Sequence, residues 1–174
     1  MNVKPGMTIR EVEETDAGAL LALHCALDQE TAFMLIEPGE RSPDIEAERE
    51  RIRNVRSRSN QTLLVADIGG RVVGYVAVLG GPYRRNSHTA YLVMGVLEAF
   101  SGQGVGGALL DAAMCRAANA NLHRLELTVM AHNDRAIRLY ERKGFLREGI
   151  RRHSLRVRDA WVDEVFMARL LPPT

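Results

Sequence analysis

Cysteine, aromatic residues and an excess of one charge are all scarce in this sequence. Only two of its 174 residues are cysteine, and 5% are aromatic. Cys25 and Cys115 both lie in alanine- and leucine-rich stretches that are typical of helices, so we expect buried free thiols and no disulfide framework. The net charge is +1. Such a balance provides no bulk attraction to nucleic acid or to a membrane surface, and we expect neither as a partner.

Long apolar runs are also missing. No stretch approaches the roughly 20 apolar residues that span a bilayer, and the polar residues 1–14 contain no apolar segment of the kind found in signal peptides. A cytoplasmic location is therefore the default expectation. The length favours a single domain over residues 1–174, and 46% hydrophobic residues are enough for a core that needs no metal or disulfide.

Periodicity and turn residues divide the chain into helices and strands. Helical spacing predicts helices at residues 17–29, 43–59, 106–119 and 134–143, the first with Asp16 as its N-cap. β-Branched runs predict strands at residues 8–12, 61–68, 71–79, 90–96, 124–130, 145–155 and 161–170. Residues 31–42 show neither pattern and are expected to form a loop. The strand–helix–strand order after residue 90 requires a parallel crossover. We therefore predict an α/β (α+β) fold with a mixed, mostly antiparallel sheet of about 6–7 strands, flanked by about four helices.

A glycine-rich turn lies between the strand predicted at residues 90–96 and the helix that follows it. Residues 102–107 are Gly-Gln-Gly-Val-Gly-Gly, and backbone N–H groups at such a turn, in front of a helix, favour a bound anion such as a pyrophosphate. A P-loop is excluded because Ala108 and Leu109 stand where it needs lysine and serine or threonine. The dinucleotide fingerprint is matched literally, but residues 97–101 separate it from the strand, and Glu126 lies inside a strand instead of at its end.

Three linked segments resemble the GCN5-related N-acetyltransferase (GNAT) superfamily. They are residues 96–110, which contain the glycine turn, residues 125–129 (Leu-Glu-Leu-Thr-Val) and residues 133–145 (Asn-Asp-Arg-Ala-Ile-Arg-Leu-Tyr-Glu-Arg-Lys-Gly-Phe). Their order and spacing carry the resemblance. The sequence looks most similar to the branch that includes ribosomal-protein and small-amine acetyltransferases, in which Glu148-Gly149 and Asp163-Glu164 with Met167 recur.

The glycine turn departs from the family pattern at one position. When Gly104 and Gly106 are aligned with the glycines of the family, Ser101 stands where arginine or glutamine is usual. A register shifted by two residues places Gln103, Gly106 and Ala108 on the pattern instead. We favour the first register because it preserves the distance from the strand, and backbone N–H groups do most of the binding in this motif.

The resemblance implies a chemistry and a set of site residues. It implies acetyl-CoA as cosubstrate, no metal, a sheet splayed at the cofactor site, and direct transfer of the acetyl group to a primary amine in a ternary complex. The amine would belong to a small amine, an amino acid or a protein N-terminus. The coenzyme-binding positions that it implies are Gly95, Val96, Leu97, Gln103, Gly104, Val105, Gly106, Gly107, Asn133 and Tyr140.

Tyr140 is also the position at which the family often carries a general acid, with its hydroxyl near the coenzyme sulfur. A phenol pKa of about 10 suits protonation of a thiolate, whose reference pKa is about 8.5. Periodicity alone explains Tyr140 equally well as a core residue, and Asn133 as a helix N-cap.

The general base is left open between Glu126, Tyr91, His88 and a chain of water molecules. Glu126 shares a strand face with Thr128, but an ion pair with Arg124 or Arg151 explains its carboxylate equally well. A separate hypothesis is an acidic rim for a cationic amine, formed by Glu37, Glu40, Asp163 and Glu164. The alternative function is a non-catalytic acyl-CoA-binding or sensor module of the same fold. Because dimers are common in the superfamily, a homodimer is one candidate oligomeric state.

Overall fold

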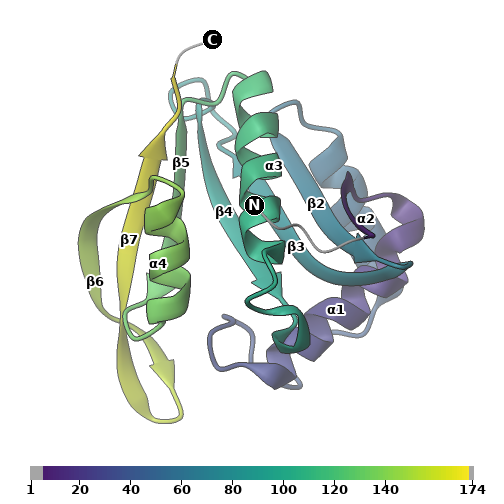
Figure 1. Ribbon diagram of the computed structural model, residues 1–174, viewed down its shortest axis with the longest axis horizontal. Helices are drawn as coiled ribbons and strands as arrows, with labels where there is room; N and C mark the ends of the chain where they lie inside the picture. Colours follow the sequence, from purple (N-terminus) through teal and green to yellow (C-terminus); the bar gives the residue numbers. More distant parts are fainter. Residues whose placement is uncertain (1–5, 173–174) are drawn as a thin grey trace.

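A seven-stranded sheet organises the protein (Figure 1). The structure is a computed structural model that describes residues 6–172. The strands are β1 (Met7–Glu11), β2 (Gln61–Ile68), β3 (Arg71–Gly80), β4 (Thr89–Val96), β5 (Arg124–Met130), β6 (Leu146–Val157) and β7 (Ala160–Leu170). The described helices are α1 (Ala17–Glu30), α2 (Ile45–Arg56), α3 (Val105–Asn119) and α4 (Asp134–Arg142), with 3₁₀ turns η1 (Glu14–Asp16) and η2 (Glu98–Phe100). The strand order is β1-β2-β3-β4-β5-β7-β6, and only β4 and β5 run parallel. The predicted mixed, mostly antiparallel fold is confirmed.

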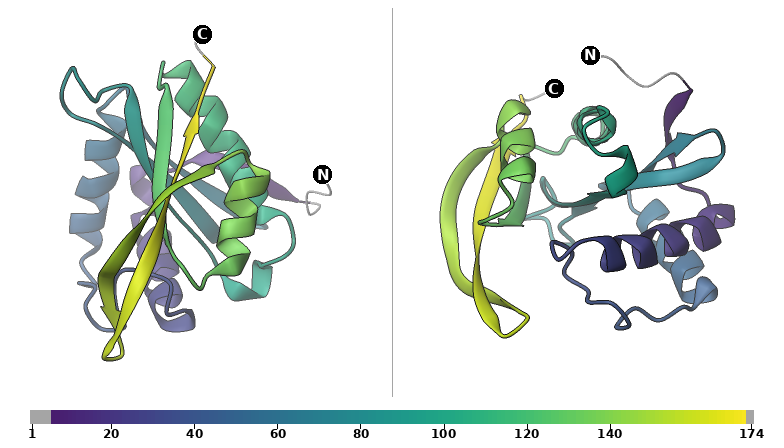
Figure 2. Two further views of the ribbon diagram at one scale, coloured as in Figure 1. Left: turned by 90° about the vertical axis from the view of Figure 1, so that its left-hand side faces the viewer. Right: turned by 60° about the horizontal axis from the view of Figure 1, so that its bottom comes forward.

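Helices cover both faces of the sheet (Figure 2). Leu27 of α1 packs under β4, where its Cδ1 lies 2.6 Å from the point that a Cβ on Gly95 would occupy. On the opposite face, a Cβ on Gly106 of α3 would lie 3.1 Å from Leu139 Cδ2 of α4 and 3.4 Å from Met94 Cε of β4. α1 and α2 therefore pack on one face and α3 and α4 on the other, and neither glycine has room for a side chain.

β4 and β5 separate after a short stretch of pairing. Their ladder consists of Thr89–Arg124, Ala90–Leu125 and Tyr91–Glu126. β4 nevertheless continues to Val96, paired on its other edge with β3, and β5 continues to Met130. Backbone groups of residues 92–96 that point toward β5 are thus left without a strand partner. The splay implied by the family resemblance is confirmed.

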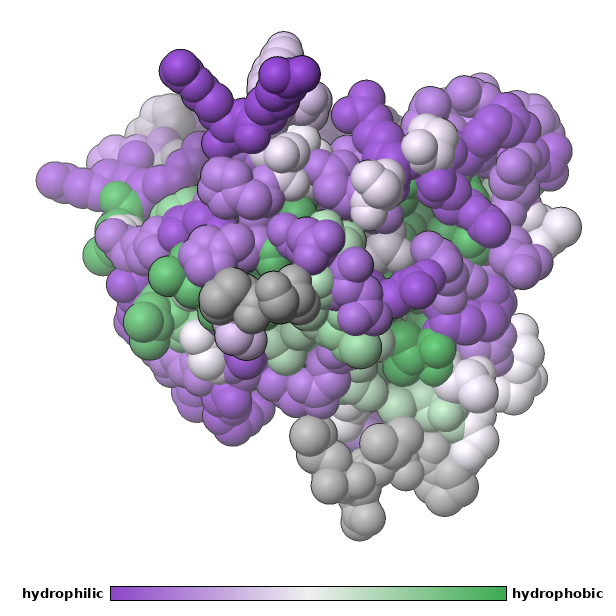
Figure 3. All heavy atoms as spheres, turned by 90° about the horizontal axis from the view of Figure 1, so that it is seen from above, coloured by the Kyte–Doolittle hydropathy of each residue, from purple (hydrophilic) through white to green (hydrophobic). Residues whose placement is uncertain are grey.

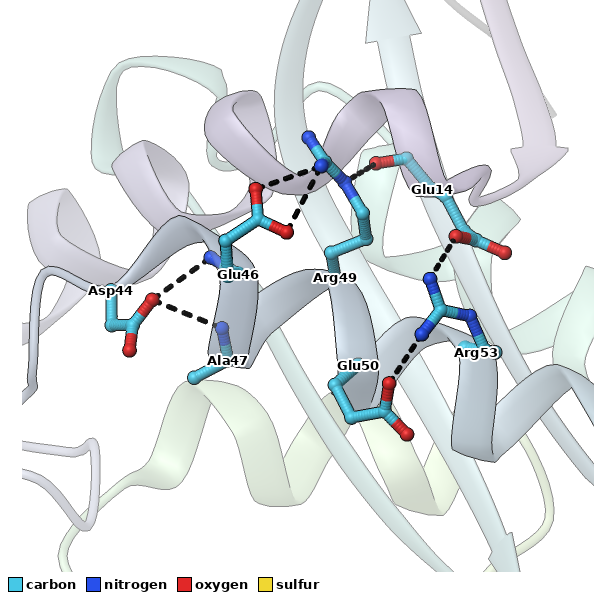
Figure 4. Close-up of polar contacts among 7 residues, drawn as sticks. All are labelled: Glu14, Asp44, Glu46, Ala47, Arg49, Glu50 and Arg53. Atoms are coloured by element: carbon cyan, nitrogen blue, oxygen red, sulfur yellow. Dashed lines mark hydrogen bonds and ion pairs between the residues drawn. The ribbon is translucent and has the colours of Figure 1, made fainter.

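Hydrogen bonds and ion pairs of charged side chains hold the charged helix α2 in place (Figure 4). Asp44 caps it, because its carboxylate accepts hydrogen bonds from the N–H groups of Glu46 and Ala47 at 2.9 and 3.1 Å. Arg53 pairs with Glu14 of η1 at 2.7 Å. Arginines that are engaged by neighbouring glutamates are typical of a solvent-facing helix.

One local prediction is wrong and another holds only in part. Cys115 is exposed and Cys25 is only half-buried. Cys115 lies off the i, i+4 stripe that forms the core face of α3. Asp16 is the N-cap residue of α1, as predicted, but its side chain makes no capping hydrogen bond to that helix. Its carboxylate accepts the Glu13 N–H at 2.8 Å and pairs with Arg10 at 2.7 Å, so it closes η1 instead.

The surface away from the α1–α2 loop is mainly hydrophilic. Figure 3 views the molecule from the end opposite the α1–α2 loop. On that face the apolar side chains form only small, separate groups. Within residues 6–172, no helix combines the length and the apolar content needed to cross a membrane.

Candidate active site

A cavity of about 1400 Å³ opens where β4 and β5 separate. Its walls come from the end of α1, the α1–α2 loop, β4, the glycine turn, β5 and α4. Tyr91 bridges the two strands at the start of the split, because its hydroxyl lies 2.6 Å from Thr128 Oγ1 and accepts the Thr128 N–H at 3.1 Å. Beyond this contact the split is open, and the cavity reaches the unpaired edge of β4.

The structure brings two of the three predicted β4 residues to the cavity. Gly95 and Val96 line it. Leu97 does not: it is buried, and its N–H donates to the Val73 carbonyl at 3.0 Å. The unpaired backbone edge therefore ends at Val96, one residue earlier than predicted. An extended amide-containing chain laid along this edge would find the hydrogen-bond partners that β5 does not supply.

Glycines in this turn serve two purposes: some adopt a positive φ, and another allows close packing. Gly102 and Gly104 adopt φ values of +74° and +84°, in the left-handed region that favours glycine. Gly104 is the N-cap of α3, so the N–H groups of the first helical turn point into the cavity with the positive end of the helix dipole behind them. Gly106 has an ordinary helical conformation and serves close packing against Leu139 instead.

The side chains of this turn contribute less than its backbone. The Gln103 side chain donates to the Ala99 carbonyl at 2.7 Å, which ties the turn to η2. Val105 is buried and does not line the cavity, whereas Gly107 does. Ser101 also lines the cavity. Backbone N–H groups are thus the main donors that this turn offers to an anion.

Basic side chains of α4 face the same turn and were not predicted. Arg135, Arg138 and Arg142 line the cavity, and Arg135 Nη2 lies 4.0 Å from the point that a Cβ on Gly102 would occupy. Lys143 also lines it and is held by Asp111, with Nζ–O distances of 2.5 and 2.6 Å. The three-and-four spacing of the arginines, which puts them on one helix face, is the sequence signal that identifies them. Together with the turn they form a site for phosphate groups.

Asn133 and Tyr140 both line the cavity. Asn133 is the N-cap of α4, and its side-chain oxygen accepts the Ala136 N–H at 3.1 Å. Tyr140 is 8% exposed, and its ring packs on Phe145 with 5.8 Å between ring centroids. Burial raises the pKa of the Tyr140 phenol well above its usual range, and the neighbouring phenols of Tyr75 and Tyr91 raise it further. Tyr140 is therefore a protonated hydroxyl at the cavity wall across the working pH range.

Glu126 does not line the cavity. Its carboxylate pairs with Arg124 at 2.8 Å, and Arg124 also pairs with Glu148 on β6. The ion pair that the sequence left as an alternative is thus the contact that Glu126 makes. His88 is exposed and outside the cavity as well, whereas Tyr91 lines it.

Only part of the predicted acidic rim lies at the cavity. Glu164 lines it and is 8% exposed. Glu37 and Glu40 line a smaller adjoining cavity of about 360 Å³, between the α1–α2 loop and the β6–β7 hairpin. Asp163 instead accepts the His153 N–H at 2.8 Å.

The site as a whole fits a long, phosphorylated ligand such as coenzyme A. The glycine turn and the α4 arginines suit its phosphates, and the open edge of β4 suits its amide-containing arm. Tyr140 and Asn133 line the same cavity. Within residues 6–172, no group of three or more histidine, cysteine or acidic side chains is placed to hold a metal ion.

Comparisons with known proteins give the family and several relatives. Residues 24–145 match the model of the acetyltransferase (GNAT) family. The mycothiol acetyltransferase of Jonesia denitrificans is 43% identical over 75 residues, which are 43% of this chain and 23% of that protein. The L-amino acid N-acetyltransferase of Escherichia coli is 35% identical over 109 residues, 62% of this chain and 67% of that protein. The solved structure of a ribosomal-protein-alanine N-acetyltransferase from Brucella melitensis has a TM-score of 0.84 at 28% identity, and covers 94% of this chain and 99% of that one. The chain spans less than a quarter of the length of the first of these relatives.

The matched residues contain all three segments that carried the resemblance in the sequence. Those segments form the glycine turn, β5 and α4, which surround one cavity. The predicted family is confirmed, and the chain belongs to the GNAT family of acetyltransferases.

Proposed function

We propose that the protein is an acetyl-CoA-dependent N-acetyltransferase that transfers the acetyl group to a primary amine by direct attack in a ternary complex. The observation that carries this proposal is one cavity that joins the glycine turn at the α3 N-terminus and the basic side chains of α4 to Tyr140 and, at its other end, to the α1–α2 loop. The names of the relatives support an acceptor that is a small amine, an amino acid or a protein N-terminus.

Residues along the cavity have different roles in binding the coenzyme and in the reaction. Backbone N–H groups at Gly104 and beyond, with Arg135 and Arg138, hold the phosphates of the coenzyme. The unpaired edge of β4 around Gly95 holds its arm, as an added strand would be held. Bound acetyl-CoA supplies a thioester whose carbonyl carbon the amine attacks. Tyr140 then donates its hydroxyl proton to the departing sulfur, because the residue lines the cavity and its phenol is protonated at neutral pH.

The first experiment measures the release of free thiol from acetyl-CoA with a panel of polyamines, amino acids, aminoglycosides and peptides with free N-termini. We expect turnover with at least one of these classes. Tight binding of coenzyme A, without turnover on any class, would favour the alternative of a non-catalytic acyl-CoA-binding module. A melting temperature raised by a nicotinamide dinucleotide and not by coenzyme A would contradict both functions.

Replacing Arg135 by glutamine is expected to raise the KM for acetyl-CoA about 5- to 30-fold, because one charged hydrogen bond to phosphate is worth about 1–2 kcal/mol at a partly exposed site. The effect should shrink as salt is added. Arg85→Gln, in the β3–β4 loop outside the cavity, removes the same charge and is the matched control. Equal KM values for the two variants would contradict a phosphate contact at Arg135.

The homodimer and the cytoplasmic location stay predictions. Light scattering at several protein concentrations tests the first, and fractionation of cells that produce the protein tests the second.

A further inference from the structure

Glu164 is a carboxylate at the end of the cavity away from the phosphate site. It lies on β7 directly opposite Met130, the last residue of β5. Met130 shares a strand face with Thr128, because side chains alternate along a strand. Glu164 is therefore the diagonal neighbour of Thr128 across the ladder, at a spacing of about 7–8 Å by strand geometry. Glu164 therefore lies on the same face as the Tyr91–Thr128 contact, near the point where β4 and β5 begin to separate.

One oxygen of this carboxylate is engaged and the other is open. Oε2 accepts a hydrogen bond from Arg151 Nη1 on β6 at 3.2 Å. Oε1 has no hydrogen-bond partner among the described residues. In that part of the chain, His24 Nδ1 is the one buried side-chain nitrogen or oxygen that lacks a partner. Oε1 is therefore accessible to solvent, and Glu164 is one of the residues that line the cavity.

Other carboxylates around the cavity are differently placed. The Glu30 carboxylate accepts the Glu98 N–H at 2.9 Å, and Asp111 is paired with Lys143. Asp134 is exposed in the first turn of α4, beside the phosphate site. Glu126, the base candidate from the sequence, is held by Arg124 outside the cavity. Glu98 also lines the cavity and is exposed, so Glu164 is the buried one among the carboxylates that line it.

The route to Glu164 lies between the α1–α2 loop and the β6–β7 hairpin. The smaller cavity of about 360 Å³ shares six residues with the large one, namely Glu30, Thr31, Met34, Leu35, Met130 and Leu155. An acceptor that enters here passes both apolar and polar side chains before its nitrogen meets the carboxylate. Polar groups on the Glu164 side of the sheet include Arg151 from β6, Thr128 from β5 and Tyr91 from β4, and, further along β5, the paired Glu126 and Arg124.

We propose that Glu164 binds the ammonium group of the acceptor through Oε1 and removes its proton, which makes it the general base of the reaction. This proposal rests on the proposed acetyltransferase function. It assigns the acceptor as a primary amine whose stem fits between the α1–α2 loop and β7. It replaces Glu126 with Glu164 in the role that the sequence left open.

The proton balance follows from two transfers. The acceptor ammonium gives one proton to Glu164 Oε1 and becomes a neutral amine. Its nitrogen forms a bond to the thioester carbonyl carbon, and the carbon–sulfur bond breaks. Tyr140 gives its proton to the sulfur and regains a proton that the nitrogen loses. Glu164 then releases its proton to solvent, so that each turnover yields an amide, a free thiol and one proton.

The test compares Glu164→Gln with the wild-type enzyme on the acceptor that shows the fastest thiol release. We expect kcat/KM at pH 7 to fall about 10²- to 10³-fold. The remaining activity should rise tenfold per pH unit toward the pKa of the amine, because only amine that is already neutral can react. Calorimetric binding of the acceptor to enzyme saturated with coenzyme A should weaken at least tenfold, whereas acetyl-CoA binding should not change. Glu164→Asp should recover part of the loss.

Asp163→Asn is the matched control, since Asp163 is the next residue but its carboxylate contacts the His153 N–H. It should behave as wild type. A Glu164→Gln variant with unchanged kcat/KM, pH profile and acceptor binding would overturn the proposal, and so would the same loss seen in Glu126→Gln instead. Both results leave the acetyltransferase function standing. Absence of turnover by the wild-type enzyme on every amine would instead overturn the function itself.

Discussion

Replacing Tyr140 by phenylalanine is expected to lower kcat about 10²- to 10⁴-fold, because the variant lacks the hydroxyl that protonates the departing sulfur. The substitution keeps the ring and hence the packing on Phe145, so the melting temperature and the Kd for acetyl-CoA should stay close to the wild-type values. Rapid-quench measurement of a single turnover separates the chemical step from product release. Tyr83→Phe, which changes an exposed tyrosine outside the cavity, serves as the control. An unaltered single-turnover rate would remove Tyr140 from the chemistry.

The same residue predicts a pH dependence. Because burial raises the pKa of Tyr140 well above its ordinary value near 10, the phenol stays protonated throughout the alkaline range in which enzymes are usually assayed. A protonated acid is the active form, so kcat should not decline between pH 8 and pH 10 through loss of this proton. A decline in that interval that disappears in Tyr140→Phe would show a less perturbed phenol than the structure indicates.

Gly104→Ala is expected to raise the Kd for acetyl-CoA about 10- to 100-fold. Gly104 has a φ of +84° at the N-cap of α3, and an L-residue held in the left-handed region costs about 1–2 kcal/mol. The turn can relieve this strain by rotating, which moves the N–H groups of the first helical turn away from the phosphates. Calorimetry with acetyl-CoA measures the change in Kd.

Gly70→Ala distinguishes loss of the phosphate site from general strain. Gly70 lies in the β2–β3 turn with a φ of +83°, and a Cβ there would meet nothing within 4 Å. The two substitutions therefore impose similar backbone strain, and both should lower the melting temperature. Only Gly104→Ala should weaken coenzyme binding. A similar Kd for both variants would contradict the backbone cradle at residues 102–107.

Features that depend on neighbours in the sequence were predicted well. The glycine turn needs residues that tolerate positive φ just before a helix, and Gly102 and Gly104 supply them within three positions. The core face of α4 follows from the spacing of Ile137 and Tyr140. Spacing of the same kind on the opposite face of α4 identifies Arg135, Arg138 and Arg142 as one basic stripe.

Local sequence patterns do not predict which of the two carboxylates, Glu126 or Glu164, lines the cavity. Both carboxylates lie on strands, on the face that carries Thr128, and strand periodicity treats them alike. Arg124, two residues before Glu126 on the same face of the strand, forms an ion pair with it. Glu164 reaches the cavity because β7 returns beside β5 and sets it opposite Met130. No local pattern near residue 164 specifies that register.

The family, the order of the elements and the glycine turn follow from the sequence, because each depends on short-range spacing and on backbone conformations that few residues tolerate. Only the folded structure shows which carboxylate lines the cavity, where the free edge of β4 ends and that Cys115 is exposed. These depend on strand register, on helix packing and on competition among charged groups for partners. Such contacts join residues that are far apart in the chain, and they are settled only when the sheet has formed.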